Sequence, residues 1–468
     1  NEDDMFNTEQ GFMDALYGIY VNMGKSDLYG GTLQTALDMT AQYYSYYDIS
    51  ECPYGHYQTF EYEHPSCTAI SDALWMRIYY CIGLTNNLLK YLDKPEAVQI
   101  CSNYDYLRGE ALALRAYLHF ELIRIFAPDV KKNPEYKSIP YRKTFSPDIE
   151  PQLKVKEVYQ EILADLTEAK QLLSNDVIRT NGPDWLGESE KKEESDDVTD
   201  KNEGYYTSDF LKTRKYRMNY YAVLGTLARV HLTLGTTDDM EKAYDYAMEV
   251  IESGKFRPIQ EEHILVSGEQ AKYRDILFTD EFIFGLYSAQ VDAFYKSNFD
   301  ESYRVEKILV NKLSDIYGQG TRDLRQTHWF KTSWGTSYLL KHNADLEYAK
   351  EKVRMITLAE MYYIAAEAHP AEAYDLLEEI LPSREIHSSL PVNAGRTEVL
   401  TEVLKEYRKE YIGDGQFFYA YKRLIEEEAA ILPLGINIPN ENKVLVWPLP
   451  QDEIKYGDRE SGIWKTEK

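Results

Sequence analysis

A helical repeat of apolar residues constrains the fold of this chain more than any other feature. In the stretch GEALALRAYLHFELIRIF (109–126), apolar side chains return every three or four residues until Pro128 ends the run. A second stretch of this kind, 155–173, follows a proline-rich connection that is expected to be a long, extended loop. The two stretches predict a pair of helices that pack on each other through their apolar faces.

Two further helical pairs follow the same plan. Helices are predicted over 219–234 and 240–251, on either side of Gly235, and over 355–368 and 371–381. Small residues at the expected contacts allow each pair to approach closely, namely Gly225, Ala228, Ala243, Ala247, Ala359, Ala366 and Ala373. Helical hairpins of about 34 residues with this alternation are typical of tetratricopeptide repeats. The sequence therefore predicts a mainly α fold of stacked hairpins with tetratricopeptide-like units.

The remaining segments are expected to be less regular. The run EFIFGLY (281–287) alternates like a short strand, and the helical period fades from there to about residue 343. Residues 188–203 have almost no apolar side chain and are predicted to be a charged, solvated insertion. We expect a single unit over 1–468, with helical hairpins in an N-terminal part (1–280) and a loop-rich C-terminal part (281–468) that holds a few short strands and ends in helices.

The charge of the chain excludes several classes of partner. Acidic residues outnumber basic ones 78 to 52, which gives a formal net charge of −26. Nucleic-acid binding needs clustered Lys and Arg, so no nucleic-acid partner is expected, and an anionic membrane surface would repel the chain. No apolar run reaches the roughly 18 residues that span a bilayer. The sequence begins at Asn1 without a methionine, which suggests that a leader with a secretion signal or lipid anchor once preceded it.

Signatures of catalysis are missing from the sequence. It contains no GxSxG, HExxH or GxxxxGK[ST] motif and no GxGxxG after a strand, so no catalytic residue, metal ion or cofactor is predicted. The cysteines lack the spacing of a zinc site, although Cys52 and Cys67 could form a disulfide or remain free thiols. A pair of carboxylates for glycoside hydrolysis stays open, because their required separation of about 5 to 9 Å is spatial.

Tyrosine is unusually abundant, with 41 residues against 16 Phe and 6 Trp. Buried cores mostly use Phe and Leu, so this surplus favours surfaces that are half apolar and half wet. Sugars have the same two aspects, since their C–H faces pack on aromatic rings while their hydroxyl groups need hydrogen-bond partners. A row of such rings can hold a glycan without any chemistry.

Three aromatic segments are predicted to be the loops that bind the ligand, around residues 41–62, 287–303 and 328–338. Rings would supply affinity, and polar neighbours would supply selectivity. The candidate ligand-binding residues are Tyr43, Tyr46, Asp48, Tyr54, His56, Tyr57, Tyr295, Asn298, Trp329, Trp334 and Tyr338. In contrast, Trp75 lies in a predicted helix over 74–89 and is assigned to the core, and His119 is interpreted as a packing residue.

Six segments resemble, in order along the chain, the landmarks of the SusD-like (RagB/SusD) nutrient-binding proteins. They are NTEQGFMDALYGIYVNM (7–23), GEALALRAYLHFELIRIFAP (109–128), RMNYYAVLGTLARVHLTLG (217–235), RMITLAEMYYIAAEA (354–368), YRKEYIGDGQFFYAYKRL (407–424) and WPLPQDEI (447–454). The resemblance covers nearly the whole chain and falls mostly on predicted scaffold helices. No ligand-binding residue carries over from it by motif.

The resemblance implies a surface-exposed lipoprotein of the outer membrane in Bacteroidetes, which caps a TonB-dependent, SusC-like β-barrel transporter. In such proteins a lipid-bearing cysteine would precede Asn1. We therefore expect a non-catalytic protein that binds oligo- or polysaccharide and delivers it to this transporter. Two alternatives stay open: a glycoside hydrolase on a helical scaffold, and a scaffold that binds only protein or peptide.

Overall fold

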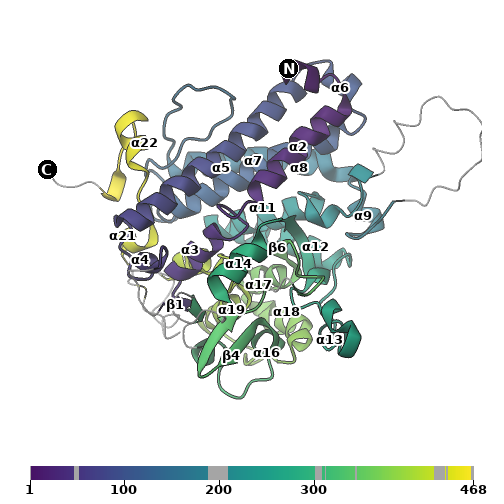
Figure 1. Ribbon diagram of the computed structural model, residues 1–468, viewed down its shortest axis with the longest axis vertical. Helices are drawn as coiled ribbons and strands as arrows, with labels where there is room; N and C mark the ends of the chain where they lie inside the picture. The colour runs from purple at the N-terminus through teal and green to yellow at the C-terminus, as the bar shows by residue number, and fades with distance from the viewer. Residues whose placement is uncertain are drawn as a thin grey trace, which may run out of the picture.

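Long helices form one side of the molecule and short helices and strands form the other (Figure 1). The computed structural model describes residues 2–46, 52–187, 209–300, 308–310, 313–342, 345–425, 438 and 441–464. The long helices are α2 (Glu9–Met23), α5 (Pro65–Leu92), α7 (Tyr104–Phe126) and α8 (Val155–Leu172), and α7 packs against each of the other three. The predicted helices over 109–126 and 155–173 are thus confirmed.

Helix α7 is buried on all sides along its second half, although it carries ionisable side chains there. These charges are paired with opposite charges from α8, from residues 214–217 and from α7 itself. Arg115 forms a two-bond ion pair with Asp165 of α8, at 2.7 and 2.8 Å. His119 lies inside the core, where its Nε2 atom accepts a hydrogen bond from the backbone N–H of Arg142. This confirms the interpretation of His119 as a packing residue.

The other two predicted hairpins are also present. Helices α11 (Tyr220–Leu234) and α12 (Thr237–Glu252) pack together, and the turn between them begins at Gly235 with φ = +68°, a conformation that glycine adopts without strain. In the third pair, α17 (Leu358–Ala368) packs on α18 (Ala373–Ile380). The first residues of the predicted helix over 355–368 instead belong to a strand.

That strand, β6 (Lys352–Thr357), pairs antiparallel with β2 (Phe282–Tyr287), which confirms the strand predicted near 281–287. A second sheet has the order β1 (Tyr44–Ser45), β3 (Leu309–Val310), β5 (Thr336–Leu339) and β4 (Phe330–Ser333). The segment between residues 287 and 343 is therefore more regular than predicted. Its helices and strands are too short to give a periodic signal in the sequence.

The remaining α-helices, most of them short, complete the fold. They are α1 (Glu2–Met5), α3 (Thr32–Thr40), α4 (Gly55–Gln58), α6 (Ala97–Ile100), α9 (Ile178–Asn181), α13 (Glu261–Ile264), α14 (Val291–Phe299), α15 (Leu313–Tyr317), α16 (Leu324–Trp329), α19 (Arg396–Glu410), α20 (Phe417–Leu424), α21 (Asn442–Leu445) and α22 (Gln451–Tyr456). None of the described helices combines the length and the apolar composition that crossing a bilayer requires.

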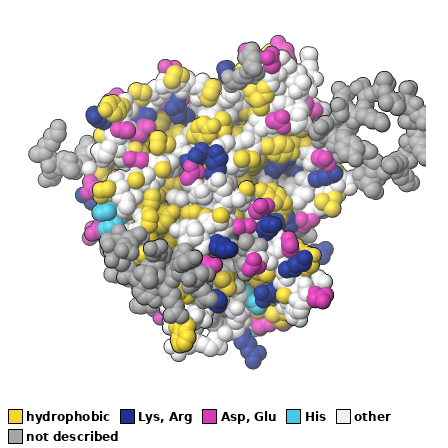
Figure 2. Space-filling model, viewed as in Figure 1, with side chains coloured by type: hydrophobic (Ala, Val, Ile, Leu, Met, Phe, Trp, Pro, Cys, Tyr) yellow, Lys and Arg dark blue, Asp and Glu magenta, His cyan; other side chains and the backbone are white. Residues whose placement is uncertain are grey.

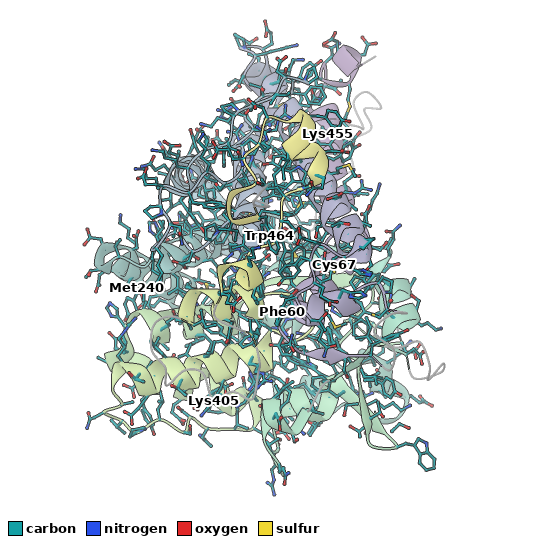
Figure 3. All side chains as sticks on the ribbon, turned by 90° about the vertical axis from the view of Figure 1, so that its left-hand side faces the viewer. Phe60, Cys67, Met240, Lys405, Lys455 and Trp464 are labelled. Carbon is teal, nitrogen blue, oxygen red and sulfur yellow. The ribbon has the colours of Figure 1, made fainter. Side chains whose placement is uncertain are left out.

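One continuous core joins the N-terminal and C-terminal parts of the chain. Trp464, near the C-terminus, lies close to Phe60 and Cys67 from the first quarter of the sequence (Figure 3), and the Tyr62 hydroxyl donates to the carbonyl of Val444 at 2.6 Å. Trp75 is 3% exposed, as expected for a core residue. All four cysteines are buried free thiols. The division of the chain near residue 280 stays a prediction.

Buried charges form a network around Glu410 at the end of α19. Its carboxylate accepts hydrogen bonds from Arg354 at 2.7 Å, Arg325 at 2.9 Å and Arg384 at 3.3 Å. All four side chains are almost completely buried. Burial alone would raise the pKa of Glu410, but the guanidinium groups of Arg384, Arg354 and Arg325 outweigh it and hold the pKa well below its usual value. These arginines come from α16, β6 and the turn after α18, so one carboxylate joins three elements.

Candidate functional site

The small four-stranded sheet brings the three predicted aromatic segments together. Tyr44 in β1 pairs with Val310 in β3, and Val310 pairs in turn with Ser337 in β5. The segment 287–303 reaches this sheet through Asn298 near the end of α14. The backbone carbonyl of Asn298 accepts a hydrogen bond from the backbone N–H of Ile308, just before β3, at 2.9 Å. Segments far apart in the sequence thus meet in the lower half of the view in Figure 1.

Several rings predicted to bind the ligand lie instead in the core. Tyr43, Tyr57 and Trp329 have no exposed surface. Their polar atoms are also occupied, because Tyr43 donates to the carbonyl of Arg408 at 2.5 Å, Tyr57 to that of Cys67 at 2.9 Å, and Trp329 to that of Ile276 at 2.5 Å. Rings enclosed in this way cannot contact a ligand, which corrects the prediction for these three residues.

Three more of the predicted tyrosines are only slightly exposed. Tyr54, Tyr295 and Tyr338 have exposed fractions of 7%, 5% and 3%. The ring of Tyr295 stacks on His342 with centroids 4.1 Å apart, and its hydroxyl donates to the carbonyl of Gly413 at 3.2 Å. These rings present little surface to a ligand in this structure, and their stacking on a glycan stays a prediction.

The polar residues predicted to contact the ligand are partly exposed, and some of them also form hydrogen bonds within the protein. His56 is partly exposed, with its Nδ1 atom 2.5 Å from the carboxylate of Glu61 and its ring stacked on His64. Asn298 is also partly exposed, and its amide donates to the carbonyl of Phe294 at 2.8 Å. Tyr46 is half-buried, and Asp48 lies outside the described residues. Tyr46, His56 and Asn298 thus keep some surface for a ligand.

Trp334 differs from all these residues because it is 86% exposed. It lies at the tip of the β4–β5 hairpin, where Ser333 pairs with Thr336 and leaves only Trp334 and Gly335 in the turn. Both turn residues have positive φ, +54° and +80°. This turn type strongly prefers Asn-Gly, and a bulky residue in the left-handed region is strained. A tryptophan that hardly contacts the core and has an unfavourable backbone conformation for its turn indicates a function at the surface.

Two hydroxyl groups, which were not predicted as site residues, accompany Trp334 on the hairpin. Thr332 in β4 is directly opposite Ser337 in β5, and their hydroxyl oxygens are 2.9 Å apart. Both residues keep exposed surface. A flat apolar ring beside groups that donate and accept hydrogen bonds has the two aspects that sugars require. In principle, the alternation of exposed and buried residues along β4 and β5 could have identified these hydroxyl groups. Each strand has only four residues, which is too few for the alternation to be recognised in the sequence.

A buried carboxyl group fixes the base of this sheet. Asp38 in α3 accepts hydrogen bonds from the backbone N–H of Gly413 at 2.6 Å and of Gly415 at 3.1 Å, and from the Tyr44 hydroxyl at 3.0 Å. Burial raises the pKa of Asp38 well above its usual value. Because its oxygens are fully engaged by protein donors, Asp38 positions β1 and has no access to a ligand. Within the described ranges, no group of three His, Cys, Asp or Glu side chains is arranged to hold a metal ion.

A small cavity of about 60 Å³ lies near the C-terminal end of α7, between α11, α17 and α20. It has room for a few water molecules. Its wall includes Lys422, whose ammonium group donates to the carbonyl of Arg124 at 2.8 Å. Burial is the main cause that lowers the pKa of Lys422 to about 7.

The lowered pKa of Lys422 predicts a pH-dependent contribution to stability. Between pH 7 and 10.5 the unfolded chain binds a proton at this lysine that the folded chain does not, so the contribution rises with pH across this window. Compared with Lys422→Met, the wild type should gain about 1 kcal/mol per pH unit from pH 7.5 to 9.5 in urea unfolding. The exposed Lys405→Met is the control. A difference between wild type and Lys422→Met that does not change with pH would contradict this assignment.

The fold and the exposed hairpin together define a helical scaffold that presents an aromatic ring to solvent. Residues 8–182 match the model of a SusD-like family described as "Starch-binding associating with outer membrane". No curated protein matches the sequence.

Solved structures share the fold along almost the whole chain. A SusD superfamily protein from Bacteroides thetaiotaomicron has a TM-score of 0.69 at 20% identity, covering 96% of this chain and 98% of its own. One from Bacteroides vulgatus has a TM-score of 0.70 at 21% identity, covering 98% and 100%. A putative sugar binding protein from Bacteroides vulgatus has a TM-score of 0.71 at 19% identity, covering 98% and 99%. Residues 8–182 thus match a SusD-like family model, and the chain shares its fold with SusD superfamily structures along almost its whole length, in agreement with the resemblance of the six sequence segments.

Proposed function

We propose that this chain is a non-catalytic carbohydrate-binding protein, which captures oligo- or polysaccharide outside the cell and delivers it to a SusC-like, TonB-dependent transporter in the outer membrane. The observation that carries the proposal is Trp334, whose ring is widely exposed and whose backbone has a strained, positive φ at the tip of a hairpin. The starch-binding description of the matching family supports the ligand class, as does the putative sugar-binding relative.

Binding at this hairpin requires no covalent chemistry. The Trp334 ring would stack on the C–H face of one sugar unit, while Thr332 and Ser337 exchange hydrogen bonds with its hydroxyl groups. Tyr46, His56 and Asn298 are the remaining candidates for contact, because each keeps exposed surface in the described structure. Figure 2 shows acidic and basic side chains interspersed over one face of the molecule, which suits a neutral ligand better than a strongly charged one.

The association with the outer membrane is part of the same proposal. The described helices contain no membrane-spanning candidate, and the matching family is described as associating with the outer membrane. We propose a lipid anchor as the attachment, as the resemblance to outer-membrane lipoproteins implies.

Incubation of the purified chain with a glycan array, followed by affinity electrophoresis in gels that contain starch or xylan, tests the ligand class. We expect retention on at least one neutral glycan and no release of reducing ends from it. Released reducing ends would show the hydrolase alternative instead. If no glycan is retained while the purified transporter binds tightly, the chain is a protein-binding scaffold and the carbohydrate proposal is wrong.

A further inference from the structure

A second hollow on the molecule, a groove of about 840 Å³, has no part in the site described above. Its lining comes from residues 181–185 after α9, from residues 254–263 up to α13, and from Asp280. In Figure 1, α9 and α13 lie along the right-hand edge, whereas β1 lies at the lower left. The volume falls within the range of about 300 to 1,000 Å³ that small-molecule sites occupy.

Hydrogen bonds hold the walls of this groove in place. Across the top, the Lys255 ammonium group donates to the carbonyl of Thr180 at 3.1 Å. The turn that carries Trp185 is fixed by the backbone N–H of Thr213, which donates to the Trp185 carbonyl at 2.8 Å, and by an ion pair between Asp184 and Lys215 at 2.6 Å. Because these bonds hold both walls, the groove is largely formed before a ligand arrives, and binding requires little ordering of the side chains and loops that line it.

The groove combines one ring with unused hydrogen-bonding groups. Trp185 is half-buried, and no other aromatic side chain among the described residues stacks on its ring. Within the same part of the chain, the side chains of Asn181, Arg257 and Glu262 form no hydrogen bond or ion pair. The groove therefore offers an apolar face, an amide, a guanidinium group and a carboxylate to whatever enters it.

The charges in the groove restrict the class of ligand. Lys255, Arg257 and Lys215, the ion-pair partner of Asp184, are balanced by Asp184, Glu262 and Asp280, and His263 is already paired with Asp280 at 2.7 Å. A phosphorylated ligand would need an excess of cations, which this set does not supply. A neutral, polyhydroxylated molecule with an apolar face fits both the ring and the mixed polar groups.

We propose that this groove is a second carbohydrate site, which takes a short neutral oligosaccharide with one sugar ring stacked on Trp185. The class of ligand rests on the proposed function, whereas the location rests on the groove alone. Two separate sites on one chain would hold a long polysaccharide at two points, which raises its apparent affinity above that of a short fragment.

Fluorine NMR on the full chain labelled with 5-fluorotryptophan tests this site, because the chain has only 6 tryptophans and each signal can be assigned by a Trp→Phe variant. The probes are maltoheptaose, xylohexaose, cellohexaose and mannohexaose, each in millimolar excess. We expect at least one probe to shift the Trp185 signal saturably, both in the wild type and in Trp334→Ala. A Trp185 signal that no probe moves would overturn the proposal.

The Trp334 signal separates this inference from the proposed function. If Trp334 responds and Trp185 does not, the second site is wrong while the carbohydrate function stands; the reverse pattern places binding in the groove and not at the hairpin. In the Trp334→Ala background, Trp185→Ala should raise the dissociation constant of the active probe at least tenfold. Leu186→Ala is the matched control, since Leu186 is 72% exposed beside Trp185 and does not line the groove. Equal binding by the two variants would also overturn the proposal.

Discussion

Replacing Glu410 with glutamine is expected to lower the free energy of unfolding by about 3 to 5 kcal/mol, the usual cost of removing one partner from a buried ion pair. Arg354 would be most affected, because its other ion-pair partner, Asp414, is 3.7 Å away. Arg325 would keep Asp323 and Glu406, and Arg384 would keep Glu281. Urea unfolding followed by circular dichroism measures the change.

The exposed Glu252→Gln is the control for Glu410→Gln, since it makes the same chemical change at the end of a surface helix. It should alter the free energy of unfolding by less than about 0.5 kcal/mol. Equal stability of the two variants would mean that other groups balance the charges of the three arginines without Glu410. The ion pairs of Glu410 would then not be what holds α16, α19 and β6 together.

Trp334→Ala should weaken binding of the retained glycan by about 1 to 3 kcal/mol, roughly 5- to 150-fold in the dissociation constant. The expected loss comes from the stacking surface of the ring, because the side chain is 86% exposed and contributes little to the core. Isothermal titration calorimetry measures the affinity, and urea unfolding measures stability on the same samples. Unchanged affinity would remove the observation on which the proposed function rests.

Trp334→Asn is the more discriminating variant. Asparagine tolerates the left-handed conformation and is preferred before glycine in this turn, so stability should stay constant or rise by up to about 1 kcal/mol while binding is lost. Tyr54→Ala gives the opposite pattern, since its 7% exposed ring packs in the core and its removal should cost stability. A loss of stability in Trp334→Asn would show that the ring serves the fold.

Periodicity predicted much of the scaffold from the sequence. Helices α7, α8 and α11 and the strand β2 extend over the predicted residues within a few positions, because long amphipathic runs and a glycine C-cap are local signals. Residues 355–357 of strand β6 were predicted to begin a helix, because Met355 and Ile356 continue the apolar pattern of residues 358–368. Pairing with β2 decides their conformation, and that partner is distant in the sequence.

The tyrosine surplus was a weaker guide to the site. Many of these rings lie in the core with their hydroxyl groups bound to buried carboxylates, as in Tyr20 with Glu110 and Tyr29 with Glu121, both at 3.0 Å or less. Such a hydroxyl satisfies a polar atom that phenylalanine would leave without a partner. Composition cannot distinguish this use from ligand binding. Of the rings named from the sequence, Trp334 is the one that the structure leaves widely exposed.

The sheet that carries Trp334 also determines when a binding surface can exist during synthesis. Its strands pair residue 45 with residue 309 and residue 310 with residue 337, whereas the long helices α5, α7 and α8 make contacts much closer in sequence. Closing loops of such different lengths separates these events in time, with local helices forming early and distant strands late. A growing chain that has not reached β5 (Thr336–Leu339) lacks this sheet, so capture of a glycan at Trp334 requires that synthesis has passed that strand.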